Sequence, residues 1–113
     1  MSAQALEAIE RILDLGEDPD DVLRGVVAEL VREPRIAWVG IQFLEDGVLV
    51  LGPEAGAADA ATRTAVPVTY QGTVVGELAA DGEADAAFLE RVAALISTHV
   101  LLGWDTAGEA WEP

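Results

Sequence analysis

The stretch from Arg35 to Pro53, RIAWVGIQFLEDGVLVLGP, has the pattern of one complete β-hairpin. Apolar and β-favouring residues run from Ile36 to Leu44 and again from Val48 to Leu51. Between the two runs lies Glu45-Asp46-Gly47, and an Asp-Gly pair can take the positive φ angles that a tight hairpin turn needs. The stretch contains no nucleophile, no set of metal ligands and no phosphate-binding loop. It therefore predicts a fold more clearly than an activity.

A second hairpin is expected downstream of the first. Two β-rich segments, Thr62 to Tyr70 and Thr73 to Ala80, are joined at Gln71-Gly72. Because Pro67 has no N–H to donate, the segment that contains it is expected at an edge of the sheet. The connection between the hairpins, Glu54 to Ala61, consists of small residues without a clear period, which predicts a loop or a single turn.

Helices are expected on both sides of the hairpins. The first runs from Ala3 to Leu15 and ends at Gly16; the last runs from about Ala84 to Leu102 or Gly103. Between the first helix and the first hairpin, Asp18-Pro19 predicts a helix N-terminus with Asp18 as the cap, and Pro34 ends that helix. The buried stripe of this helix is predicted to be Val22, Leu23, Val26, Val27, Leu30 and Val31.

The order of these elements predicts an α+β fold. We expect an antiparallel sheet of about four strands with the N- and C-terminal helices packed on one face. Residues 1–103 are expected to form a single domain, and residues 104–113 an acidic tail. We expect Trp104 or Trp111 of this tail to pack on the sheet face that the helices leave uncovered, in the same subunit or in a partner.

Composition excludes several classes of function. The 113 residues have room for one hydrophobic core, and 51% of them are hydrophobic. The formal net charge of −15 repels phosphate backbones and anionic lipid headgroups, so no nucleic-acid or membrane partner is expected. The sequence has no cysteine, which excludes disulfides, thiolate catalysis and cysteine-based zinc sites. Charges at Glu7, Glu10 and Arg11 argue against a signal peptide, and a cytoplasmic protein is expected.

Five short segments in this order resemble a GAF domain, the small-molecule-sensing α+β module related in architecture to PAS domains. They are Trp38-Val39-Gly40-Ile41, Leu44-Glu45-Asp46-Gly47, Leu49-Val50-Leu51-Gly52-Pro53, Val66-Pro67-Val68 and Gly72-Thr73-Val74-Val75-Gly76-Glu77-Leu78. The first hairpin is most similar to the free methionine-(R)-sulfoxide reductase branch of that family. The resemblance implies a GAF-like antiparallel sheet with flanking helices.

The chain departs from that family in two ways. Relatives that bind small molecules build the pocket from a long segment between the two hairpins, and here only Glu54 to Ala61 lies there. The reductase branch carries its catalytic and resolving cysteines in the same region, whereas this chain has none. Because thiol-based reduction needs a sulfur nucleophile, we expect no enzymatic activity and assign no catalytic residue and no cofactor.

One candidate ligand site lies on the first hairpin. Strand alternation places Trp38, Gly40 and Gln42 on the face where related domains bind ligands, if Val39 and Ile41 face the helices. A polar glutamine beside an aromatic ring, with a glycine leaving space between them, is a plausible floor for a small apolar or aromatic ligand. The candidate ligand-binding residues are Trp38, Gly40, Gln42 and Glu77. The alternative is a semi-exposed sheet face without a ligand.

Other polar residues receive structural interpretations. His99 lies on the apolar stripe of the last helix without a second histidine, which favours a packed or interface residue. Two acidic sets, Glu17-Asp18-Asp20-Asp21 and Asp81-Glu83-Asp85, lie at predicted helix starts and lack the spacing of a calcium loop. We assign them to helix capping and predict no metal site.

The function that these observations favour is association. The apolar stripes of the first and last helices exceed what a domain of this size can bury internally, so we expect a homodimer, as the family resemblance also implies. The predicted interface residues are Leu6, Ile9, Leu13, Leu95 and His99. A signalling role would also require an unidentified protein partner. The alternative is a sensory domain that binds a small molecule at Trp38 and Gln42.

Overall fold

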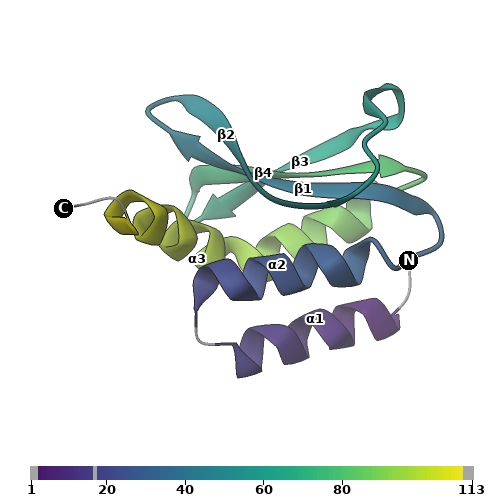
Figure 1. Ribbon diagram of the computed structural model, residues 1–113, viewed down its shortest axis with the longest axis horizontal. Helices are drawn as coiled ribbons and strands as arrows, with labels where there is room; N and C mark the ends of the chain where they lie inside the picture. Colours follow the sequence, from purple (N-terminus) through teal and green to yellow (C-terminus); the bar gives the residue numbers. More distant parts are fainter. Residues whose placement is uncertain (1–2, 17, 111–113) are drawn as a thin grey trace.

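The computed structural model describes residues 3–16 and 18–110, and their side chains from residue 4 to residue 102. Three helices, four strands and one 3-10 turn follow one another in the predicted order (Figure 1). They are α1 (Ala3–Leu15), α2 (Pro19–Leu30), β1 (Ile36–Glu45), β2 (Val48–Gly56), η1 (Ala60–Thr62), β3 (Thr64–Tyr70), β4 (Thr73–Gly82) and α3 (Ala86–Ala110).

The four strands form one antiparallel sheet in the order β2-β1-β4-β3. The two hairpins therefore lie side by side, joined where β1 pairs with β4. Pro67 lies on the edge strand β3, as the sequence predicts, and it is paired with Glu77 of β4. In both hairpins the two turn residues have positive φ, at 52° and 80° for Asp46 and Gly47. This geometry confirms the Asp-Gly turn on which the fold prediction rests.

The helices lie on one face of the sheet, as expected (Figure 1). Helices α2 and α3 pack directly on the strands, and α1 packs against α2 and α3 on the side away from the sheet. The core between these layers takes alternate residues of the central strands, such as Val39 and Ile41 of β1 and Leu78 of β4. All five residues from Val22 to Leu30 in the predicted stripe of α2 are buried, and Val31 is half-buried.

Several element ends differ from the expectations, and β3 and β4 span Thr64–Tyr70 and Thr73–Gly82 in place of the predicted Thr62 to Tyr70 and Thr73 to Ala80. Asp18 precedes α2 as predicted, but its side chain makes no capping hydrogen bond. Strand β2 continues to Gly56, so the connection between the hairpins is shorter than expected and contains the single turn η1. Helix α3 continues past Gly103 to Ala110. The side chain of Trp104 and all of Trp111 lie outside the described residues.

No helix in the described part of the chain is long and apolar enough to cross a membrane.

Candidate functional site

All four predicted ligand-binding residues lie on the sheet face opposite the helices, which we call the outer face. Trp38, Gly40 and Gln42 alternate with the core residues of β1, and Gln42 lies directly opposite Glu77 on β4. Gln42 and Glu77 are half-buried, whereas Trp38 is only 3% exposed. Strand alternation therefore placed Trp38, Gly40 and Gln42 on the correct face, and the pairing of β1 with β4 adds Glu77 to it.

The indole of Trp38 fills the space above Gly40. A Cβ atom added at Gly40 would collide with Cζ2 and Cη2 of the indole. The sequence predicted that Gly40 leaves room beside Trp38, and in the structure the tryptophan takes that room itself.

Two side chains from outside β1 hold the indole in place. Trp38 Nε1 donates a 2.8 Å hydrogen bond to Glu54 Oε1 on β2. The guanidinium of Arg63 lies over the ring, with Cζ 4.3 Å from the ring centroid, in the geometry of a cation–π contact. We call Trp38, Glu54, Arg63 and Asp81 the Trp38 cluster.

Asp81 anchors the cluster from the end of β4. Its side chain is fully buried and accepts two hydrogen bonds from Arg63, from Nε at 2.8 Å and from Nη2 at 2.9 Å. The backbone N–H of Asp59 donates a third, at 2.6 Å. The hydrogen bond from Arg63, above all, holds the pKa of Asp81 below its ordinary value, against the opposing effect of burial. These bonds tie the short connection between the hairpins to the sheet.

Sequence reasoning missed Asp81, Arg63 and Glu54. The set Asp81-Glu83-Asp85 was assigned to helix capping, and only Asp85 behaves in that way, with Oδ1 accepting from the N–H of Ala87 at 3.1 Å. Asp81 instead belongs to β4. One feature of the sequence could have placed Asp81 on the outer face. Asp81 follows Glu77 by four residues, and residues four apart in a strand lie on the same face.

Among the described residues, no group of three or more metal-ligating side chains could hold an ion. This finding covers Asp18, Asp20, Asp21 and the second acidic set, while Glu17 lies outside the described part.

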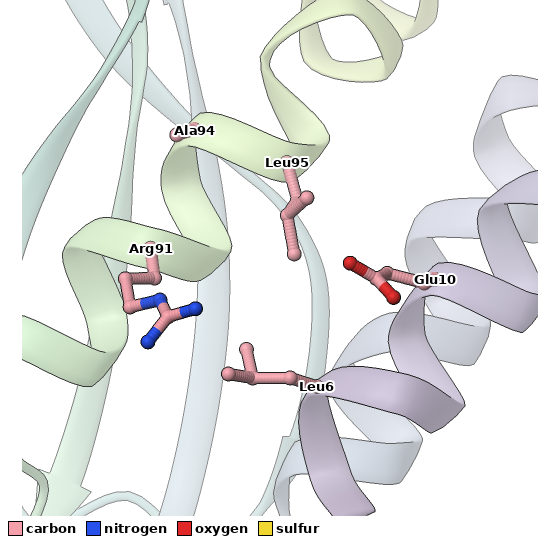
Figure 2. Close-up of a pocket in the computed structure, with 5 residues that line it drawn as sticks. All are labelled: Leu6, Glu10, Arg91, Ala94 and Leu95. Atoms are coloured by element: carbon pink, nitrogen blue, oxygen red, sulfur yellow. The ribbon is translucent and has the colours of Figure 1, made fainter. Parts of the chain in front are cut away.

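Two of the predicted interface residues, Leu6 of α1 and Leu95 of α3, line a hollow between these helices, on a surface that we call the α1/α3 face. Leu6, Leu13, Leu95 and His99 are half-buried. Ile9 is fully buried within the chain, so its side chain is not available at the surface for contact with a second copy. The hollow has a volume of about 210 Å³, and Figure 2 shows the residues that line it, which are Leu6 and Glu10 of α1 and Arg91, Ala94 and Leu95 of α3.

His99 is the titratable residue among the predicted interface residues. Its Nδ1 atom is buried and has no hydrogen-bond partner among the described residues. Burial lowers the pKa of His99 below its ordinary value, because removal from water disfavours the charged imidazolium.

Because the pKa of His99 is lowered in the folded chain, the free energy of unfolding should decrease as the pH is lowered through a defined window. The unfolded chain takes up a proton near pH 6.5 and the folded chain only at lower pH, so this contribution is complete above about pH 6.5 and is lost as the pH falls below it. His99→Leu should therefore show a flatter fall in the free energy of unfolding between about pH 7 and 5.5. Urea unfolding at several pH values measures this, and equal slopes for the two proteins would refute it.

Gly40→Ala is predicted to destabilise the domain by about 1 to 3 kcal/mol, because the new methyl group displaces a packed indole. Thermal and urea unfolding measure the loss. The matched test repeats the substitution in Trp38→Phe, where the clashing Cζ2 and Cη2 atoms of the indole are replaced by a smaller ring. An equal cost in both backgrounds would show that the indole does not set the requirement for glycine.

No protein-family model and no curated protein matches the sequence. Solved structures do match the fold over most of its length. The GAF domain of an Acinetobacter phosphoenolpyruvate-protein phosphotransferase superposes with a TM-score of 0.73 at 16% identity, covering 96% of this chain and 99% of that one. The free methionine-R-sulfoxide reductase of Neisseria meningitidis, in complex with its substrate, gives 0.71 at 17% identity, covering 94% and 95%.

A third match is the type II free methionine-R-sulfoxide reductase of Thermoplasma acidophilum, with a TM-score of 0.64 at 21% identity over 73% of this chain and 92% of that one. At these identities the likeness defines the fold alone. The chain has a GAF-like α+β fold, as its hairpin motifs indicate, and its structural neighbours include a GAF domain as well as free methionine-R-sulfoxide reductases.

Proposed function

We propose that this chain is a non-catalytic GAF-like domain that works in the cytoplasm as a homodimer, formed through the α1/α3 face. The observation that carries the proposal is a contrast between two surfaces. The Trp38 cluster closes the outer face above Gly40 with the chain's own side chains, whereas the α1/α3 face leaves leucines half-exposed around a hollow.

The chemistry of the α1/α3 face supports pairing with a second copy. Leu6 and Leu95 flank the hollow, and a two-fold axis would place the leucines of one copy against those of the other. Arg91 and Glu10 lie at the same hollow (Figure 2), and neither makes an ion pair with another described side chain. In a two-fold dimer, Arg91 of each copy can pair with Glu10 of the other, which fixes the orientation of the helices.

The non-catalytic part of the proposal rests on chemistry. The structural neighbours that are reductases share the fold, but a thiol-dependent reduction requires cysteine, and the sequence contains none. Incubation with free methionine sulfoxide and a chemical reductant tests this part directly. Turnover above the rate of the reductant alone would overturn it.

The oligomeric state tests the association itself. Light scattering after size-exclusion chromatography should give twice the chain mass at high micromolar concentration. Because each copy carries a net charge of −15, added salt should strengthen the dimer by screening repulsion between copies. A monomer at all concentrations and salt levels would refute the homodimer.

A sensory role at the outer face is the competing function. It requires a ligand that displaces or packs beside the indole of Trp38, near Gln42. A thermal-shift screen of small aromatic and apolar compounds, repeated on Gln42→Leu and Trp38→Ala, separates the two functions. A stabilising compound whose effect disappears in both variants would favour the sensory role over association alone.

A further inference from the structure

Strand β2 presents an unusual edge to solvent. It is the outermost strand on its side of the sheet, and its first four residues, Val48 to Leu51, are all apolar and between 40% and 62% exposed. The opposite edge strand, β3, is protected in the ordinary way, because Pro67 has no N–H to offer a further strand and the register shifts between Val68 and Thr69. The β2 edge has no comparable protection within its first four residues.

Hairpin geometry shows which backbone groups this edge leaves open. In a hairpin with a two-residue turn, the closing pair, here Glu45 and Val48, exchanges hydrogen bonds across the ladder. The next residue, Leu49, then directs its N–H and C=O away from β1, and Leu51 does the same. In the described chain no other strand pairs with these groups. The edge can accept a further strand without losing a bond to β1.

A hollow of about 310 Å³ lies beside this edge. Phe43 and Val50 give it an apolar floor, while Asp20 at the start of α2 and Glu45 at the end of β1 supply acidic walls. Arg24 also lines it, and its guanidinium is paired with Asp21 at 3.4 Å. The hollow can take an apolar side chain from a strand laid along β2, and its acidic walls favour a cation nearby.

The acidic residues near the β2 edge determine which kind of strand can pair with it. If two copies paired through β2 with their open backbone groups aligned, Leu49 would face Leu51 of the second copy, and Asp46 would face Glu54 at both ends. Like charges opposed across a strand pair are destabilising, and each copy carries a net charge of −15. A second copy is therefore a poor occupant, and a segment with basic ends is a good one.

We propose that the β2 edge is a docking site for an extended, basic segment of another protein, which adds to the sheet as a fifth strand. Backbone bonds to Leu49 and Leu51 supply the register. Alternate apolar residues of the segment pack on the exposed valines and leucines, and its basic ends lie near the acidic residues at the two ends of the edge. This site is separate from the α1/α3 face, so a dimer could bind two such segments.

The test uses the full chain and a synthetic probe. The probe is a fluorescent peptide of alternating valine and threonine with two lysines at each end. Its matched control has glutamates in place of the lysines. Fluorescence anisotropy measures affinity, and amide shifts of the isotope-labelled chain locate the contact. The variants Leu49→Lys and Leu51→Lys change exposed side chains on the edge, and Val74→Lys changes an equally exposed valine on β4.

The lysine peptide should bind with amide shifts centred on Val48 to Leu51, and its affinity should fall with added salt. Leu49→Lys and Leu51→Lys should weaken binding about tenfold or more, and Val74→Lys should leave it within about twofold. Equal binding of the glutamate peptide, equal effects of all three variants, no binding at about 1 mM peptide, or self-association through β2 would each overturn the proposal.

Discussion

Asp81→Asn is expected to lower the free energy of unfolding by about 1 to 3 kcal/mol, the range for lost hydrogen bonds to a charged group. The carboxylate accepts two bonds from Arg63 and one from the backbone of Asp59, and its side chain is fully buried. Asparagine keeps the shape but offers only one acceptor atom, so at least one of these donors is left without a partner. Urea unfolding at neutral pH measures the loss. Glu83→Gln removes one charge from an exposed position two residues away and serves as the control.

The same variant has a predicted pH dependence. Because the folded chain lowers the pKa of Asp81, its contribution is complete above the unfolded pKa, near 4, and is lost as the pH falls through the lower folded value. The difference between Asp81→Asn and the unmodified chain should therefore shrink as the pH is lowered from about 5 to 3. A difference that stays constant over this interval would show that the carboxylate charge is not what Arg63 stabilises.

Leu95→Asp is expected to raise the dimer dissociation constant by about 30-fold or more, which corresponds to the loss at an interface hot spot. The aspartate would replace an apolar contact at the hollow of the α1/α3 face and add a negative charge near Glu10. Sedimentation equilibrium measures the change. Val74→Asp places the same charge on an exposed apolar residue of β4 and should leave the dimer unchanged.

Because Leu95 also packs on its own chain, a charge exchange provides a second test of the same face. Arg91→Glu alone should weaken the dimer, and adding Glu10→Arg should restore it, since the exchanged pair is again complementary. A dimer that is equally stable in Leu95→Asp, Arg91→Glu and the unmodified chain would contradict the assignment of this surface.

The sequence correctly predicted the structural features that depend on residues close together in the sequence. The turn at Asp46-Gly47, the stripe of α2 and the edge position of the strand with Pro67 each depend on a few consecutive residues, and the structure has all three. Alternation along β1 likewise placed Trp38, Gly40 and Gln42 on one face.

The features that escaped prediction depend on the pairing of distant strands. Asp81 meets Arg63 because β3 and β4 are paired and β4 continues two residues beyond its predicted end at Ala80. Strand alternation gives the face on which Trp38 lies but not its rotamer, so it could not show that the indole covers Gly40. Helix α3 continues to Ala110, past its predicted end at Leu102 or Gly103, and a glycine within a helix costs only about 1 kcal/mol relative to alanine.

Intermolecular contacts in solution show whether two copies associate through the α1/α3 face. A dimer assembled from one copy with labelled methyl groups and one unlabelled copy gives, in isotope-filtered NMR spectra, only contacts between copies. We expect such contacts for the methyl groups of Leu6, Leu13 and Leu95. Contacts confined to β2 or the outer face, or no intermolecular contact at a concentration where the mass is that of a dimer, would contradict this expectation.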